Sequence, residues 1–345
     1  MSFRPMLLST TLAALLWACG AADSQQAEPA ADHGAGEVVR VHATLDEVVP
    51  EDYQIEDLAG GLIFTEGPLW VTGWEENPFL LFSDVPGNAI YRWNPAGNVT
   101  EFKKPVFSGD YEEGRFIGSN GLTLDKEGVL YVCEHGNRRI SRVTRTGEWT
   151  PFVERYQNKR FNSPNDAVFK SDGWLYFTDP PYGLMGQDED PAKELAFNGV
   201  FRVSPDGRQV EKLAEQSRPN GLAFSPDEKT LYVANSDPER KVWMAYPVAD
   251  DGTLGSGRVF YDVTSESAEG LPDGLKVDKE GRLFASGPGG VWIFSAAGRH
   301  LGTIQPAEAP ANVAWGGSDG STLYMTARSG LYRIKLNTSG AIPGA

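Results

Sequence analysis

Six similar units follow one another through most of the chain. Each holds short runs of apolar and β-branched residues, and turns rich in Gly, Asp and Asn separate the runs. The second runs are FLLFSD (79–84), VLYVCE (129–134), WLYFTD (174–179), TLYVAN (230–235), RLFASG (282–287) and TLYMTA (322–327). Six units of four strands, at a period of roughly 45 to 55 residues, predict an all-β, six-bladed β-propeller with four-stranded antiparallel blades.

The sixth unit lacks its fourth strand, because its third run is followed only by the turn NTSG (337–340). Two spare strand-like segments stand near the other end of the chain, EVVRVHATL (37–45) and YQIEDLA (53–59). We expect one of these N-terminal segments to complete the last blade, which would join the two ends and leave no exposed edge. Residues 37–345 are therefore predicted to form a single domain.

The first residues of the chain do not fit the repeat. Arg4 precedes an apolar run, 6–18, that is too short to span a bilayer as a mature helix. Residues 1–18 are therefore predicted to be a secretory signal peptide. The sequence LWACG around Cys19 resembles a bacterial lipobox, which would make Cys19 the lipid-carrying first residue of the mature protein.

Simple cleavage near Ala22 is the alternative to lipidation. Residues 19–36 are rich in Ala, Glu and Gln and are predicted to be a disordered tether. We expect an exported protein of the bacterial cell envelope or periplasm, in contact with the membrane only through this anchor.

The net charge of the chain limits the classes of partner that it can bind. A formal net charge of −16 argues against nucleic acid, whose binding requires a basic face. No HExxH helix or phosphate-binding P-loop is present in the sequence. An acidic protein of this kind tolerates bound cations well.

An acidic or amide residue stands just before the first strand of every unit. We call these positions the slot residues: Glu66, Asn120, Asn165, Asn220, Asp273 and Asn312. Because the first strand of each propeller blade lines the central channel, these side chains are expected to meet at one mouth. Two carboxylates and four carboxamides favour a hard divalent cation, above all Ca²⁺, with Mg²⁺, Mn²⁺ or Zn²⁺ as alternatives. The competing interpretation is that each residue only forms a turn.

A set of motifs in fixed order carries a family resemblance. TEGPLW, GLTLDKEG, CEHGNRRISR, FNSPNDAVFKSDGWLYFTDPPYG, RPNGLAFSPD and LPDGLKVD are similar to the SMP-30/gluconolactonase/regucalcin-like family, most of all its bacterial gluconolactonase branch. The resemblance covers about residues 50 to 336 and implies a six-bladed propeller with one divalent cation. The implied ligands are Glu66, Asn165, Asn220 and Asp273. Asn120 and Asn312 would then support these ligands or bind substrate.

The reaction that follows is hydrolysis of a sugar lactone. The cation would stabilise charge on the carbonyl oxygen, and a nearby carboxylate would activate water. The resemblance implies Asp273 for this role, and His135 is the alternative base, unless it is only a loop histidine. Arg160 and Tyr182 are candidate substrate-binding residues, Arg160 by analogy with the family's other branch and Tyr182 as a lid.

Two further functions compete with a sugar lactonase. One is a hydrolase of other lactones or of phosphotriesters, since fold alone does not determine chemistry. The other is a non-catalytic envelope propeller that binds a ligand. Retention of both Glu66 and Asp273 favours an enzyme.

Overall fold

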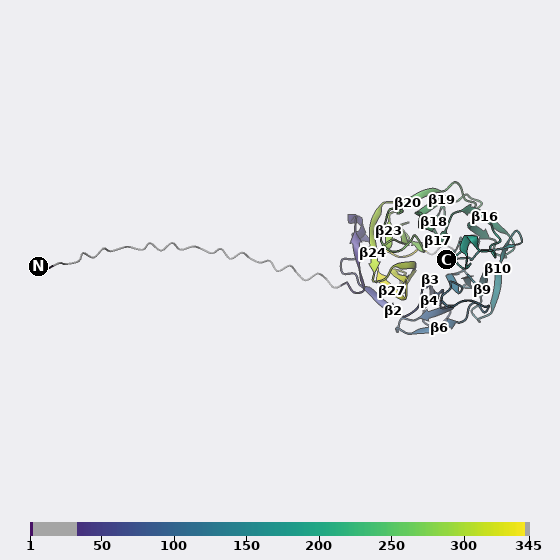
Figure 1. The fold of residues 1–345 in the computed structure, drawn as a ribbon, viewed down its shortest axis with the longest axis horizontal. Coiled ribbons are helices and arrows are strands. Elements are labelled where there is room, and N and C mark those ends of the chain that lie inside the picture. Colours follow the sequence, from purple (N-terminus) through teal and green to yellow (C-terminus); the bar gives the residue numbers. More distant parts are fainter. Residues whose placement is uncertain (3–32, 342–345) are drawn as a thin grey trace. The chain divides into compact units, whose positions relative to one another are not determined.

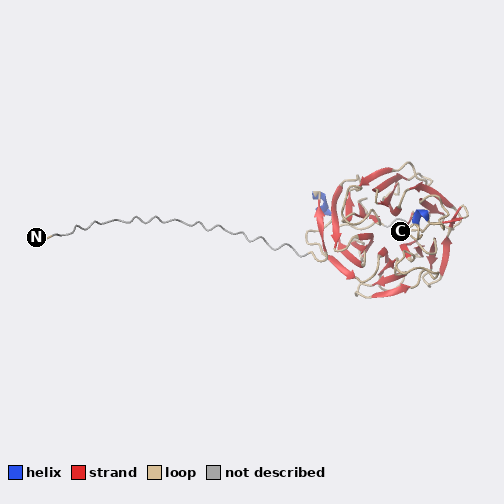
Figure 2. Ribbon diagram, in the orientation of Figure 1, coloured by secondary structure: helices blue, strands red, loops and turns tan. Residues whose placement is uncertain are grey.

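The computed structural model describes residues 1–2 and 33–341. The regular secondary structure of residues 33–341 consists of β-strands and two short 3₁₀ turns, and loops and turns connect the strands (Figure 2). Six sheets of at least four antiparallel strands follow one another in chain order. The predicted six-bladed β-propeller with four-stranded antiparallel blades is therefore confirmed.

The first three blades contain strands only from their own repeat units. Blade one holds β3 (Thr65–Val71), β4 (Phe79–Asp84), β5 (Ala89–Trp93) and β6 (Val99–Lys103). Blade two holds β7 (Ser119–Leu124), β8 (Leu130–Glu134), β9 (Arg139–Val143) and β10 (Trp149–Val153). Blade three holds β13 (Ala167–Phe169), β14 (Leu175–Asp179), β15 (Gly199–Val203) and β16 (Val210–Glu215).

The last three blades include the two N-terminal strands. Blade four holds β17 (Pro219–Phe224), β18 (Thr230–Asp237), β19 (Arg240–Pro247) and β20 (Arg258–Asp262). Blade five holds β21 (Leu275–Val277), β22 (Leu283–Gly287), β23 (Gly290–Phe294), β24 (His300–Pro306) and β1 (Gly36–Arg40). Blade six holds β25 (Pro310–Gly316), β26 (Thr322–Ala327), β27 (Gly330–Lys335) and β2 (Ile55–Ala59).

Three small elements lie outside the blades. They are the 3₁₀ turns η1 (Ala43–Glu47) and η2 (Gln187–Glu189) and the hairpin of β11 (Arg155–Tyr156) with β12 (Lys159–Arg160).

The first strand of each blade faces the centre of the ring. β3 and β17 lie toward the middle of the propeller, whereas β6, β10 and β20 lie at its rim (Figure 1). Each first strand contacts the first strands of the two neighbouring blades, from β3 to β7 and so on to β25. Residues at the starts of these strands therefore gather around one axis.

The ring is closed by the second of the two candidate segments. Strand β2 pairs antiparallel with β27, with Ile55 opposite Ile334 and Glu56 opposite Arg333. The other candidate, 37–45, does not complete blade six, because its strand β1 pairs with β24 at the outer edge of blade five. Closure by an N-terminal strand is thus confirmed, and both segments cover an edge that would otherwise be exposed.

One apolar cluster fills the space between each pair of neighbouring blades. Between blades six and one, for example, Phe82 and Trp93 pack with Tyr324 and Leu331. Both faces of a middle strand are therefore buried, and for this reason runs such as FLLFSD are nearly continuous in apolar residues. Burial of each large apolar side chain contributes roughly 1.5–3 kcal/mol.

Residues 3–18 of the predicted signal peptide (1–18) and Cys19 lie outside the described residues, as does most of the predicted tether (19–36). In the described part of the chain, the ring of His33 stacks on that of Tyr53 with centroids 4.0 Å apart. Within residues 1–2 and 33–341, no helix has the length and hydropathy needed to cross a bilayer.

Candidate functional site

Five of the six slot residues line one cavity of about 320 Å³ at a mouth of the channel. These five are Glu66, Asn120, Asn165, Asn220 and Asp273. The loop that follows β14 supplies Tyr182 to the wall, and the end of β18 supplies Ser236.

Glycine follows four of the slot residues because neighbouring inner strands touch there. A Cβ on Gly221 would lie 2.4 Å from the backbone oxygen of Asp273 in the next blade. A Cβ on Gly67 would lie 2.0 Å from the backbone oxygen of Asn120, and Gly67 has a left-handed φ of 50°. These pairs are therefore not simple turns: the glycine lets two blades approach closely enough for their slot residues to share a site.

Glu66 is a buried carboxylate inside β3. Its Oε2 accepts hydrogen bonds from the Gly67 backbone N–H at 2.8 Å and from Asn312 Nδ2 at 3.0 Å. Burial raises the pKa of Glu66 to about 7, and the negative charge of Asp166 adds to the rise. Glu66 therefore keeps its proton to a higher pH than an ordinary glutamate does.

Asp273 stands two residues before β21 and lines the same cavity as Glu66. Its Oδ1 is buried and has no hydrogen-bond partner among the described residues. Burial raises the pKa of Asp273 well above its ordinary value, and the negative charges of Glu66 and Asp166 raise it further. Carboxylates that repel each other in this way can all ionise when a cation lies among them.

The amide side chains add oxygen atoms to this cavity. Asn120 Oδ1 is buried without a partner among the described residues. Asn220 donates its Nδ2 to Ser236 Oγ at 2.8 Å, which leaves its Oδ1 available to a ligand. An unpaired buried polar atom costs about 1–3 kcal/mol, so unpaired oxygens at one place fit a site that receives a cation.

The acidic side chains do not form a metal site by themselves. Within the described residues, no group of three or more His, Cys, Asp or Glu side chains comes together as one. Bound calcium is typically surrounded by six to eight oxygen atoms, drawn from carboxylates, amide carbonyls and water. A cation here would therefore need the Asn165 and Asn220 oxygens besides Glu66 and Asp273.

Asn312 is not among the residues that line the cavity. Of the two roles expected of it, support of the ligands or binding of substrate, its contacts are those of a supporting residue. Its Nδ2 donates to Glu66 Oε2 and lies 3.4 Å from Asp166 Oδ2, while its Oδ1 accepts from the Val313 N–H. Its polar atoms are thus engaged inside the protein. Lys276 Nζ lies 4.0 Å from Asp166 Oδ2 and supplies a positive charge next to Asp166.

The segments with the motifs FNSPND and FTDPPYG are joined by hydrogen bonds beside the cavity. Asp179, buried at the end of β14, accepts a hydrogen bond from the Ser163 N–H at 2.8 Å. Ser163 Oγ in turn donates to the Pro180 carbonyl at 2.6 Å. Burial raises the pKa of Asp179 to about 7. These contacts hold Asn165 and Tyr182 in place on the cavity wall.

Tyr182 lines the cavity, as its predicted role requires. Burial raises the pKa of its hydroxyl, the charge of Asp273 raises it further, and a hydrogen bond with Ser236 opposes the rise. The Tyr182 hydroxyl is therefore neutral at physiological pH and lies close to Asp273, where it can donate a hydrogen bond to a substrate.

His135 is fully buried and is not among the residues that line the cavity. Its Nδ1 lies 3.2 Å from the carbonyl oxygen of Phe116, and its Nε2 has no partner among the described residues. Burial lowers the pKa of His135 to about 4. Its backbone contact is of the kind expected of a loop histidine.

Arg160 is also not brought to the cavity. Its Nη2 donates to the Asn137 carbonyl at 2.8 Å, and its backbone N–H donates to Glu194. The hairpin of β11 and β12 carries it to blade two, because Ser163 and Pro164 intervene before Asn165.

The cavity also contains residues that the sequence did not single out. These wall residues show no pattern comparable to that of the slot residues. They are Phe64, Phe116, Gln187, Ser236 and Leu271. Asp166 does not line the cavity, but its charge acts on Glu66 and Asp273. It had a visible signal, because it occupies the position after a slot residue that holds Gly in four other units.

Comparison with known proteins places the chain in one protein family. Residues 64–329 match the model of the SMP-30/gluconolactonase/LRE-like region. The chain is 40% identical over 319 residues to a gluconolactonase of Zymomonas mobilis, covering 88% of this chain and 87% of that protein.

Two solved structures illustrate the fold. A gluconolactonase from Xanthomonas campestris superposes with a TM-score of 0.74 at 34% identity, over 87% of this chain and 94% of the other. Regucalcin from Agrobacterium tumefaciens, described as a calcium-binding protein, gives a TM-score of 0.64 at 19% identity, over 84% and 96% of the two chains. The second likeness is evidence for the fold alone.

Proposed function

The chain belongs to the SMP-30/gluconolactonase/LRE-like family, and we propose that it is a lactonase that opens a sugar lactone with the aid of a divalent cation. One observation carries the proposal: two buried carboxylates and three amides converge on a cavity in which Asn120 Oδ1 and Asp273 Oδ1 lack partners. The cavity of about 320 Å³ lies at the lower end of the range for small-molecule sites, which suits a single sugar ring.

Glu66, Asn165, Asn220 and Asp273 would hold the cation. They offer only oxygen atoms, which favours Ca²⁺ over softer metals. When bound, such a cation polarises a carbonyl group and lowers the pKa of a water molecule. The raised pKa values of Glu66 and Asp273 support this assignment, since a positive charge between them would relieve their repulsion.

Asp273 is the general base in this proposal. Its Oδ1 has no competing hydrogen bond, so it can take the proton of a water molecule that attacks the lactone carbonyl. The same carboxyl group then returns the proton to the ring oxygen as the ester C–O bond breaks. His135 is less suited to this role because it lies outside the cavity wall and one ring nitrogen faces Phe116.

Three other wall residues position the sugar. Asn120 Oδ1 accepts a hydrogen bond from a substrate hydroxyl, and the Tyr182 hydroxyl donates one. Phe64 provides an aromatic face beside these polar groups. Such a mixture of one aromatic ring and a few fixed polar groups is typical of small-molecule sites.

The test is an assay of the purified protein with glucono-1,5-lactone and other lactones. Hydrolysis should require Ca²⁺, disappear with chelator and return when Ca²⁺ is added back. Chelator-resistant hydrolysis would rule out the cation, and a lack of hydrolysis of every lactone with metal present would rule out the enzyme.

We also infer that the protein is exported and lipid-anchored, on the basis of residues 1–18 and Cys19. Labelling of cells with radioactive palmitate should mark the native protein and fail to mark the Cys19→Ser variant. Equal labelling of both proteins would contradict the anchor.

A further inference from the structure

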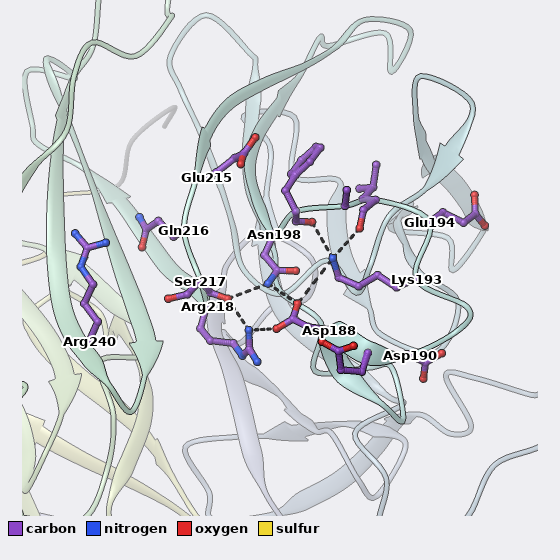
Figure 3. Close-up of a pocket in the computed structure, with 14 residues that line it drawn as sticks. Asp188, Asp190, Lys193, Glu194, Asn198, Glu215, Gln216, Ser217, Arg218 and Arg240 are labelled. Atoms are coloured by element: carbon purple, nitrogen blue, oxygen red, sulfur yellow. Dashed lines mark hydrogen bonds and ion pairs between the residues drawn. The ribbon is translucent and has the colours of Figure 1, made fainter.

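A second hollow opens on the same face as the channel cavity. It is a polar groove of about 820 Å³ between the loop that follows β14 in blade three and the starts of β17 and β19 in blade four (Figure 3). In the proposed function a single sugar ring occupies the channel cavity, so this larger groove has no role with a monosaccharide lactone.

The groove and the channel cavity share one wall. Gln187 lines the cavity, and the next residue, Asp188, lines the groove. Arg218, at the edge of the groove, forms an ion pair with Asp188 and places its Nη2 3.4 Å from Gln187 Oε1. The positive charge of Arg218 also acts on the Tyr182 hydroxyl, which lies in the cavity. A ligand held in the cavity therefore reaches the groove by passing this wall.

The groove offers both hydrogen-bond donors and acceptors that the protein does not use. Gln216 Nε2 donates to the Tyr246 hydroxyl at 3.1 Å, whereas its Oε1 is buried and has no partner among the described residues. The Arg240 guanidinium lies 3.9 Å from the Met244 sulfur and forms no ion pair within the described part of the chain. Figure 3 shows that other groups of the groove are already engaged with one another or with backbone oxygens: Asp188, Lys193, Asn198, Ser217 and Arg218.

The charges in the groove indicate which kind of ligand it suits. Five carboxylates and three cationic side chains line it, so a phosphate or carboxylate group would meet net repulsion. An apolar group would leave the unpaired donors and acceptors unsatisfied. A neutral, polyhydroxylated group meets neither difficulty.

We infer that the groove binds a second sugar, and that the substrate class is an aldonolactone bearing a neutral glycosyl group. This inference rests on the proposed lactonase function and specifies its substrate. The lactone ring occupies the channel cavity while the glycosyl group crosses the wall of Gln187 and Arg218. Gln216 and Arg240 then bind hydroxyl groups of the second sugar.

The first experiment compares kcat/KM for glucono-1,5-lactone with that for cellobiono-1,5-lactone, its 4-O-glucosyl derivative. We expect a preference of about ten-fold or more for the disaccharide lactone, the factor given by one or two additional hydrogen bonds. Hydrolysis of glucono-1,5-lactone with no gain for the larger substrate would overturn this inference and leave the lactonase standing. A lack of hydrolysis of either lactone would overturn both.

The second experiment uses variants of the groove. Gln216→Ala and Arg240→Ala should each raise KM for cellobiono-1,5-lactone by about three- to ten-fold, the range for one lost hydrogen bond, and leave glucono-1,5-lactone hydrolysis unchanged. The matched control is Lys229→Ala, which removes an exposed cation from the turn between β17 and β18. Equal effects on both substrates, or no effect on either, would contradict a glycosyl site.

Discussion

At the scale of single residues, the site depends on Asp273 and Glu66, two carboxyl groups brought together from distant parts of the chain. Burial and the charge of Asp166 raise the pKa of both groups, and the charge of Glu66 raises that of Asp273 further. Two such carboxyl groups do not stabilise a protein whose cavity is empty, because ionised carboxylates that lack a counter-charge destabilise the folded state. The proposed bound cation and proton transfer would give both groups a function.

The first prediction concerns the base. Asp273→Asn keeps the shape of the side chain and removes its ability to accept a proton, so kcat should fall by roughly 10²- to 10⁴-fold. Circular dichroism should show an unchanged fold. Asp250→Asn, in an exposed turn of blade four, is the matched control and should retain full activity. Near-normal activity in Asp273→Asn would remove it as the base.

The second prediction concerns pH. The pKa of Glu66 in the cation-free protein is about 7, so below pH 7 a cation has to displace a proton from it. The affinity for Ca²⁺, measured by isothermal titration calorimetry, should therefore rise between pH 6 and pH 8, by up to about ten-fold per unit for each proton released.

Glu66→Gln is the control for this experiment. The variant should bind Ca²⁺ more weakly and show a smaller dependence on pH, because one titrating group is gone. The same affinity at pH 6 and pH 8 in the unaltered protein would contradict a cation bound by Glu66.

At the scale of structural elements, the inner strands and not the side chains decide how close the slot residues come. Gly221 has an ordinary backbone conformation, and a Cβ there would lie 2.4 Å from the Asp273 oxygen and 2.6 Å from the Gly274 Cα. Both are backbone atoms, which cannot move aside by a change of rotamer. Two blades would have to separate.

The third prediction follows from this contact. Gly221→Ala should lower the free energy of unfolding by about 1–3 kcal/mol in urea and weaken Ca²⁺ binding, because Asp273 is displaced. Gly60→Ala is the matched control, since a Cβ on Gly60 has no atom within 4 Å. It should change the stability by less than about 0.5 kcal/mol. Equal stability of both variants would show that the inner strands are not in tight contact.

At the scale of the whole propeller, β2 joins the last blade to the start of the chain, whereas β1 only widens blade five. The segment between them also contributes to the core, because Leu45, Val48 and Val49 are fully buried against blades five and six. Stability should therefore depend much more on residues 43–60 than on residues 33–42.

The fourth prediction tests this difference by truncation. A chain that starts at residue 43 lacks β1 and should still unfold cooperatively, at a somewhat lower melting temperature. A chain that starts at residue 61 also lacks β2, exposes the edge of β27, and should aggregate or lose its cooperative transition. Calorimetry and size-exclusion chromatography measure both. A monomeric, cooperatively folding second variant would contradict closure by β2.

The sequence by itself determined the repeat, the number of blades and six of the residues that meet in the cavity: five slot residues and Tyr182. These follow from local rules: side chains alternate along a strand, turns require particular residues, and equivalent positions in successive units occupy equivalent places in a ring. The slot residues could be found because Glu66 and Asp273 recur at the same point of the unit as the amides.

Only the tertiary structure decided which N-terminal segment closes the ring, how deep each side chain lies and what surrounds it. Both candidate segments have strand patterns, and their partners are set by packing between distant parts of the chain. Asn312 shares its unit position with the wall residues yet points its amide at Glu66 and Asp166 and does not line the cavity. His135 and Arg160 carry suitable chemistry but are directed elsewhere by their loops. How deeply a side chain is buried and which way it points depend on contacts between blades, and the spacing of residues along the chain does not encode these contacts.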